Sequence, residues 1–154
     1  MSNGSGKKRV LAIASGGGHW TQLLRLRPAF DDCIVHFATV DATAAAAVRP
    51  APVYTFPDAN RDTKIRLIFA ILKVMWIVLR VRPHVIVSTG AAPGYLAIRF
   101  GKMLGARTMF IDSIANAQEM SLSAHLAKRH ADRLLSQWPE VAEKENVPYR
   151  GSVL

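Results

Sequence analysis

Three short segments of the chain carry residue types that could bind an anion or move a proton. The first is the run Ser15-Gly16-Gly17-Gly18-His19, in which glycines would let backbone N–H groups approach a phosphate at the positive start of a helix. His19 stands beside that position, and an imidazole that titrates near neutral pH can remove a proton from an attacking hydroxyl. The structural alternatives are a tight turn with a capping role and a histidine that caps the loop.

A second glycine-containing turn, at 89–94, repeats this pattern after another apolar run. Its glycines would again allow the backbone to approach a ligand closely, so this turn could hold another part of the molecule that the first turn binds. We therefore expect both turns to contribute to one diphosphate site. The residues expected there are Ser15, Gly16, Gly17, Gly18, Thr89, Gly90 and Gly94.

The third segment, at 111–116, places a carboxylate, a hydroxyl and an amide directly after an apolar run. Polar groups at such a position can bind sugar hydroxyls, and we expect Ser113 and Asn116 to contact an acceptor sugar. Asp112 could orient either His19 or the acceptor. Capping of the following helix by Asp112 or Ser113 is the structural alternative.

A dinucleotide site is a different interpretation of the first glycine run, because Asp41 follows the second strand where an acidic residue would meet a ribose. The glycine pattern argues against it. Thr21 stands where the fingerprint requires a third glycine, and His19-Trp20 would crowd the entry to the helix. A P-loop is excluded because no Gly-Lys-Ser/Thr sequence follows the glycines.

Strands and helices must bring these segments together, and the hydrophobic pattern predicts that they alternate. Apolar runs rich in β-branched residues predict strands at 9–14, 33–40, 53–56, 85–88, 107–111 and 133–137. Helices are expected at 20–30, 62–81, 95–104, 121–129 and 139–144, with a final ordered segment at 149–153. This alternation predicts an α/β fold, a Rossmann-like and mainly parallel sheet with helices on both faces. Ligands of such sheets bind beyond the carboxyl ends of the strands, where all three segments lie.

The predicted helix at 62–81 is apolar nearly all round, which is more than one buried face requires. Basic residues surround it, a composition that suits the interface of an anionic membrane. Its apolar stretch at 67–79 falls short of the roughly 17–25 residues that span a bilayer. Burial against a protein partner is the alternative. The expected membrane contacts are Lys64, Arg66, Phe69, Lys73, Trp76 and Arg80.

The overall composition fits one globular domain at 9–154 after a flexible tail at 1–8. Lys and Arg number 20 against 11 acidic residues among 154, and the resulting formal charge of +9 indicates an anionic partner. Nucleic acid is a poor candidate, since no basic–aromatic interleaving or recognition-helix pattern is present. The single cysteine, Cys33, excludes an internal disulfide, and no signal peptide is recognisable, so we expect a cytosolic protein.

The motifs together resemble those of a known family. The loop at 14–26 is similar to the first loop of the membrane-side, acceptor-binding subunit of the split N-acetylglucosamine transferase that adds the second sugar to dolichol diphosphate. Bacterial exopolysaccharide subunits of this type, some serving glucuronosyl transfer, are similar in pattern, as is the acceptor domain of the peptidoglycan N-acetylglucosaminyltransferase. The other matching landmarks are Ser88-Thr89-Gly90 with Pro93-Gly94, Phe110-Ile111-Asp112-Ser113-Ile114, Gln137-Trp138-Pro139 and Tyr149-Arg150-Gly151-Ser152-Val153.

The resemblance implies the N-terminal half of a GT-B fold, which binds a polyprenyl-diphosphate sugar while a separate subunit binds the UDP-sugar. The family's glycine loop falls on 16–18, its base on His19 and its acidic strand-end residue on Asp112, where family members often carry glutamate. Eukaryotic relatives begin with a membrane anchor, and we expect no counterpart of it in this chain. The helix at 62–81 is therefore expected to place the protein on the cytoplasmic face of a bacterial inner membrane.

The resulting hypothesis is a glycosyltransferase subunit that is inactive without its donor-binding partner. The glycine turns hold the lipid diphosphate, and His19 removes the proton of the acceptor hydroxyl. Asp112 orients either His19 or the acceptor. No metal or cofactor is expected, because helix N-termini and basic residues can neutralise the diphosphates. The alternatives are a non-catalytic membrane scaffold that recruits a transferase and a nucleotide-binding Rossmann protein that acts alone.

Overall fold

The computed structural model of the protein describes residues 6–58 and 64–153. Six parallel strands form one sheet in the order β3-β2-β1-β4-β5-β6. All six expected strands are present, each within a few residues of its predicted bounds. They are β1 (Arg9–Ile13), β2 (Ile34–Thr39), β3 (Val53–Thr55), β4 (Val85–Ser88), β5 (Arg107–Ile111) and β6 (Arg133–Leu135).

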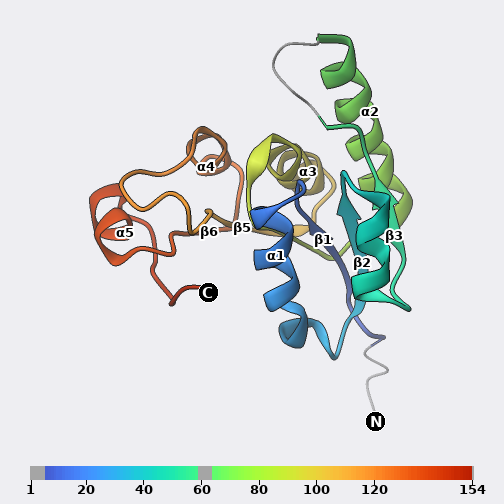
Figure 1. The fold of residues 1–154 in the computed structure, drawn as a ribbon, viewed down its shortest axis with the longest axis horizontal. Helices are drawn as coiled ribbons and strands as arrows, with labels where there is room; N and C mark the ends of the chain where they lie inside the picture. The colour runs from blue at the N-terminus through green and yellow to red at the C-terminus, as the bar shows by residue number, and fades with distance from the viewer. Residues whose placement is uncertain (1–5, 59–63, 154) are drawn as a thin grey trace.

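Helices cover both faces of this sheet, as expected, and Figure 1 shows α1 and α2 on different sides of the strands. One core packs α2, α3 and α4 against the inward side chains of β1, β4 and β5. The other core packs α1 and two 3-10 helices against the opposite face. The helices are α1 (Gly18–Arg25), η1 (Arg27–Phe30), η2 (Ala42–Val48), α2 (Lys64–Val81), α3 (Ala91–Met103), α4 (Leu122–Ala127) and α5 (Pro139–Glu145).

The helices differ from the prediction in three main ways. The helix expected at 20–30 is divided into α1 and η1, because Pro28 has no N–H to continue the hydrogen-bond ladder. The helix η2 was not expected at all. The helix α3 starts at Ala91, four residues before its predicted start, so part of the supposed second glycine turn is helical. The first two residues of the helix expected at 62–81 lie outside the described residues.

The order of the strands creates a crevice between β1 and β4. From β1 the chain proceeds to β2 and β3 on one side, and it then returns to β4 on the other side. Ile13 pairs with Ser88 at the carboxyl ends of these two strands. The loops that follow them therefore start side by side, at the point where open α/β sheets bind ligands.

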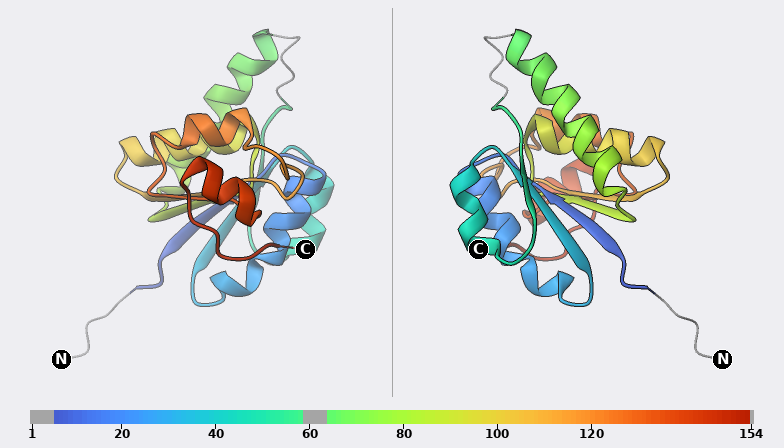
Figure 2. Two further views of the ribbon diagram at one scale, coloured as in Figure 1. Left: turned by 90° about the vertical axis from the view of Figure 1, so that its left-hand side faces the viewer. Right: turned by 90° about the vertical axis from the view of Figure 1, so that its right-hand side faces the viewer.

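The helix α2 has a buried face and an exposed apolar face. Its buried residues are Ala70, Val74, Ile77, Val78 and Val81. The first turns of α2 project beyond the rest of the domain in both views of Figure 2. Among the described helices, none combines the length and the apolar character that crossing a membrane requires. The exposed apolar residues of the helix are Ile65, Ile68, Phe69, Leu72, Met75, Trp76 and Leu79.

His36 on β2 is a partly buried group whose protonation we expect to couple to folding. Its ring stacks on Tyr54 with centroids 6.0 Å apart, and its buried Nδ1 has no hydrogen-bond partner among the described residues. Burial, followed by the charges of Arg9 and Arg80, lowers the pKa of His36 below its ordinary value of 6.5. The unfolded chain therefore takes up this proton more readily than the folded protein does.

We expect the free energy of unfolding to fall as the pH falls from about 7 to about 5, because the unfolded state then binds the proton first. The variant His36→Phe keeps the stacked ring and removes the titrating group, so its acid-dependent loss should be smaller. Urea unfolding of both proteins across this pH range measures the difference. Identical pH profiles would contradict this assignment.

Candidate active site at the carboxyl ends of β1 and β4

The glycine loop after β1 is held tightly against the end of β2. Gly17 has φ 63°, a left-handed conformation that favours glycine, and it directly precedes α1. A Cβ on Gly16 would lie 3.1 Å from Cγ2 of Val40. The hydroxyl of Thr39, which is buried, donates to the carbonyl oxygen of Ser15 at 3.4 Å. The loop thus presents its backbone at the positive end of α1 in a fixed shape.

Two hydrogen bonds join this loop to the turn after β4. His19 Nδ1 lies 2.9 Å from the carbonyl oxygen of Thr89, and the Thr89 hydroxyl donates to the carbonyl oxygen of His19 at 2.6 Å. A carbonyl oxygen can only accept, so Nδ1 must carry the ring proton of the neutral imidazole. The other ring nitrogen, Nε2, then keeps its lone pair and can act as a base.

Gly90 makes the close approach of His19 possible. Its φ of 132° is a conformation that residues with side chains rarely adopt. A Cβ at this position would also clash with Nδ1 and Cε1 of the His19 ring. The structure therefore brings together the first two segments that the sequence singled out.

Gly94, which we predicted to contact the diphosphate, is part of a helix rather than of a turn. Gly94 is buried in the first turn of α3, where a Cβ would overlap the hydroxyl of Ser88. Its lack of a side chain lets α3 pack closely on the end of β4. Thr89 and Gly90 remain the residues of this turn that face the glycine loop.

Asp112 holds its own loop and does not orient His19 in this structure. Its buried carboxylate accepts hydrogen bonds from Ser113 N at 3.0 Å, Asn116 Nδ2 at 2.9 Å, and Ser121 N and Oγ at 2.9 and 2.7 Å. Ser121 in turn caps α4 by accepting from the N–H of Ala124. In this structure the carbonyl oxygen of Thr89, and not Asp112, bonds the His19 ring, while orientation of the acceptor by Asp112 stays a prediction. Asp112 shapes the loop that bears Ser113 and Asn116.

A buried polar network ties the third segment to α1. Gln22 donates to the hydroxyl of Ser113 at 3.2 Å and accepts from the N–H of Ile114 at 3.1 Å. Gln137 donates to Gln22 Oε1 at 2.6 Å and to the carbonyl oxygen of Asp112 at 2.8 Å. The helix α1 is therefore joined to the loops after β5 and β6.

Sequence reasoning missed the positioning roles of Gln22 and Gln137. A signal was present for Gln22, which stands next to Leu23 on the face of α1 that must be buried, where a polar side chain needs partners. Gln137 stands out in the sequence only through the motif Gln137-Trp138-Pro139. Its partner could not be read from the sequence, because the two glutamines are 115 residues apart.

Replacing Gln22 with leucine should weaken the fold, because it leaves the Ile114 N–H and the Gln137 amide without their buried partner. We expect the free energy of unfolding to fall by about 2–3 kcal/mol. Thr21→Ala, on the exposed side of the same helix, should change it by less than about 0.5 kcal/mol. Urea unfolding compares the two variants with the native chain, and equal stabilities would contradict a buried network.

Asp41, the acidic residue that would meet a ribose in a dinucleotide site, makes hydrogen bonds to Thr43 instead. The Asp41 carboxylate accepts from the N–H of Thr43 at 2.8 Å and from its hydroxyl at 2.7 Å, and so caps η2. These hydrogen bonds, first that of the hydroxyl, lower the pKa of Asp41. The structure thus gives Asp41 a capping function, which weakens the dinucleotide interpretation.

A match to a protein-family model identifies the family of this chain. The model described as "Oligosaccharide biosynthesis protein Alg14 like" matches residues 58–153, which include β4, the third segment and Gln137. The chain belongs to the Alg14 family. This confirms the resemblance predicted from the motifs. The family match starts after the glycine loop and therefore does not include it.

Several curated relatives carry the name UDP-N-acetylglucosamine transferase subunit ALG14. The Eremothecium gossypii protein is 26% identical over 169 residues, which cover 89% of this chain and 75% of that protein. The human protein is 23% identical over 167 residues, which cover 88% of this chain and 77% of that protein. The Yarrowia lipolytica protein is 35% identical over 69 residues, which are 41% of this chain and 32% of that protein. Alg14 membership and these relatives confirm the prediction of a glycosyltransferase subunit.

Solved structures confirm the fold. MurG of Acinetobacter baumannii superimposes with a TM-score of 0.69 at 13% identity, over 95% of this chain and 45% of that chain. The UDP-N-acetylglucosamine 2-epimerase of Rickettsia bellii gives the same TM-score and identity, over 96% and 45%. The chain therefore spans less than half the length of either structure. Because proteins with different reactions share this fold, the fold alone does not assign the chemistry.

Proposed function

We propose that this Alg14-family chain is the acceptor-binding subunit of a two-component glycosyltransferase. It would present a polyprenyl-diphosphate-linked saccharide to a UDP-sugar held by a separate donor-binding subunit. The observation that carries the proposal is the pair of hydrogen bonds between His19 and Thr89, which joins two helix-initiating turns and leaves Nε2 free. The names of the relatives support the same class of reaction.

The diphosphate would lie over the two turns after β1 and β4. The N-termini of α1 and α3 start there, at Gly18 and Ala91, so two helix dipoles favour an anion in the same crevice. No acidic side chain occurs in the sequence of either turn, 15–18 or 89–90. Backbone N–H groups can therefore approach phosphate oxygens without repulsion from a carboxylate.

His19 would act as the base in the transfer. Nε2 accepts the proton of the acceptor hydroxyl while the hydroxyl oxygen attacks the anomeric carbon of the donor sugar, and the bond to UDP breaks. The proton makes the imidazole cationic, and the hydrogen bond from Nδ1–H to the carbonyl oxygen of Thr89 stabilises that cation. No further base is needed for this step.

An apolar hollow beside the glycine loop gives the lipid chain a path. Its volume is about 440 Å³, and Val40, Phe56, Pro57, Phe69 and Lys73 are among its lining residues. Val40 is the residue that a Cβ on Gly16 would contact. The first isoprene units could therefore run from the diphosphate toward the exposed face of α2.

The same face of α2 would rest on the cytoplasmic surface of the inner membrane. The residues expected to contact the membrane are exposed, with Phe69 at 60% and Trp76 at 46%. Lys73 lies 4.4 Å from the centre of the Trp76 ring, which joins a cation to an amphipathic aromatic side chain. A helix of this type suits the boundary between lipid headgroups and acyl chains.

The two similarities favour different donor sugars. The relatives' names point to UDP-N-acetylglucosamine. The motif resemblance to exopolysaccharide subunits points to UDP-glucuronic acid. A reconstituted pair should therefore be offered both donors, with a short-chain polyprenyl-diphosphate sugar as acceptor.

We expect transfer from one of these donors only when both chains are present. The non-catalytic scaffold alternative predicts instead that the partner alone, in detergent, transfers sugar at the full rate. That outcome would overturn the proposal. Omitting this chain and adding it back is the decisive comparison.

A further inference from the structure

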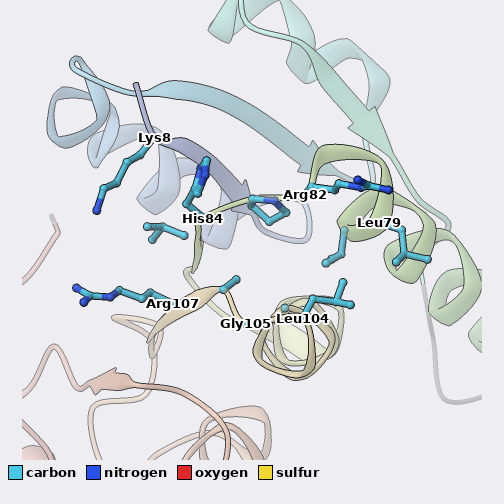
Figure 3. Close-up of a pocket in the computed structure, with 12 residues that line it drawn as sticks. Lys8, Leu79, Arg82, His84, Leu104, Gly105 and Arg107 are labelled. Atoms are coloured by element: carbon cyan, nitrogen blue, oxygen red, sulfur yellow. The ribbon is translucent and has the colours of Figure 1, made fainter. Parts of the chain in front are cut away.

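A second hollow lies at the opposite end of the sheet from His19. It has a volume of about 590 Å³ and opens at the amino ends of β4 and β5, between the C-terminal ends of α2 and α3 (Figure 3). The lining residues include Lys8, Arg82, His84 and Arg107 and no acidic side chain. Nothing in the proposed transfer reaction uses this hollow.

Three cations of the hollow are free to bind a ligand. In the described part of the chain, the side chains of Lys8, Arg82 and Arg107 make no hydrogen bond or ion pair. Capping of the nearby helix does not explain them, because Arg9 donates to the carbonyl oxygens of Val81, the last residue of α2, and of Arg82, which follows it. The neighbouring Lys102 is paired with Asp132 and is therefore not available.

His84 adds a hydrogen-bond donor to this basic side. Its Nδ1 accepts the N–H of Arg9 at 3.0 Å. In the neutral ring the proton must then sit on Nε2, which becomes a donor. Lys8 and Arg107, which lie at the same end of the hollow as His84, combine with this N–H donor into a set that recognises phosphate oxygens.

The other end of the hollow carries Arg82 beside Leu79 (Figure 3) but is otherwise apolar, and it continues into exposed hydrophobic surface. In Figure 3, Lys8 and Arg107 lie at one end of the hollow, and Leu79 and Leu104 lie at the other. A smaller apolar hollow of about 110 Å³ adjoins it and shares these two leucines. Leu104 is 57% exposed and its neighbour Met103 76% exposed. Leu79 also belongs to the exposed apolar face of α2, so the hollow and this face of α2 meet at Leu79.

We propose that this hollow binds the headgroup of an anionic phospholipid. The phosphate contacts Lys8, His84 and Arg107, and an acyl chain lies along Leu79 and Leu104. The inference rests on the proposed placement of α2 on a membrane, because that placement brings the hollow to the level of the headgroups. The ligand chemistry is a phosphate ester with an apolar chain, which distinguishes it from a free phosphate.

Vesicle binding of the full chain tests this site. The variant Lys8→Gln with Arg107→Gln removes two charges from the hollow and keeps the long side chains. Vesicles of phosphatidylcholine with phosphatidylglycerol should bind it about 20–30-fold more weakly than the native chain, since each basic residue near an anionic surface contributes about fivefold. On vesicles of phosphatidylcholine alone, the two proteins should bind equally.

A matched control removes the same charge elsewhere. Arg129→Gln with Lys144→Gln changes two exposed residues near α4 and in α5, far from α2 in Figure 1. This variant should lose less than about threefold, because neither residue lines the hollow or belongs to α2. Equal losses in both variants would overturn the site and leave the membrane placement of α2 intact. Failure of the native chain to bind any vesicle would instead overturn that placement as well.

A soluble probe separates a lipid site from a phosphate site. Short-chain phosphatidylglycerol, below its micelle concentration, should shift the amide resonances of Gly105 and Ala106, which line the hollow. Glycerol phosphate and inorganic phosphate at the same concentration should not shift them. Equal shifts with the soluble phosphates would overturn the lipid assignment, and so would no shift with the lipid.

Discussion

The variant His19→Asn should lower the kcat of the reconstituted pair by about 10²–10⁴, the contribution of a general base. Asparagine places an N–H donor close to the position of Nδ1, so the hydrogen bond to the carbonyl oxygen of Thr89 can persist. What disappears is Nε2, the nitrogen that accepts the proton. The rate of sugar transfer at saturating acceptor measures the effect.

Two controls distinguish loss of the base from loss of the fold. The thermal unfolding midpoint of His19→Asn should stay near that of the native chain, and the variant should still bind the donor subunit. His125→Asn changes an exposed histidine of α4 and should keep the native rate. Full activity of His19→Asn would leave the imidazole with a structural function only.

The second large effect is expected from Gly90→Ala. The added methyl group clashes with the His19 ring, and φ of 132° is unfavourable for alanine. A displacement of the base by about 1 Å can lower the rate about 10²-fold. The strained backbone should also lower the free energy of unfolding by about 1–3 kcal/mol.

Gly105→Ala is the matched control for this substitution. Gly105 also has a positive φ, 82°, but a Cβ there would meet no atom within 4 Å. It should therefore show a loss of stability without the loss of activity, when transfer is assayed in detergent. If both alanine variants transfer sugar equally well, the contact between His19 and Gly90 has no catalytic importance.

The sheet could be predicted from the sequence because its central strands are buried on both faces. Runs such as Val10 to Ala14 and Val85 to Val87 are continuous and apolar, as is typical of parallel strands covered by helices. The helices were harder to delimit. The first turn of α3 contains Pro93 and Gly94, which indicate a turn by local preference, while packing against Ser88 makes it helical.

The candidate site was predictable in its parts and not in its connections. The glycine run and His19 were recognisable from residue type and spacing. The partner of His19 was not, because the Thr89 carbonyl is a backbone group with no sequence signature, 70 residues away. The hydrogen-bond partners of Asp112 could not be predicted for a related reason. A carboxylate after a strand looks the same whether it faces a ligand or, as here, caps its own loop.

Equilibrium binding by this chain alone is the most direct test of its proposed role as the acceptor half. Calorimetry should be run with a short-chain polyprenyl-diphosphate sugar and, separately, with UDP-N-acetylglucosamine and UDP-glucuronic acid. The proposed function predicts that the lipid diphosphate binds, that Gly17→Val weakens this binding by disturbing the left-handed turn, and that neither UDP-sugar binds. Binding of a UDP-sugar without binding of the lipid diphosphate would contradict it.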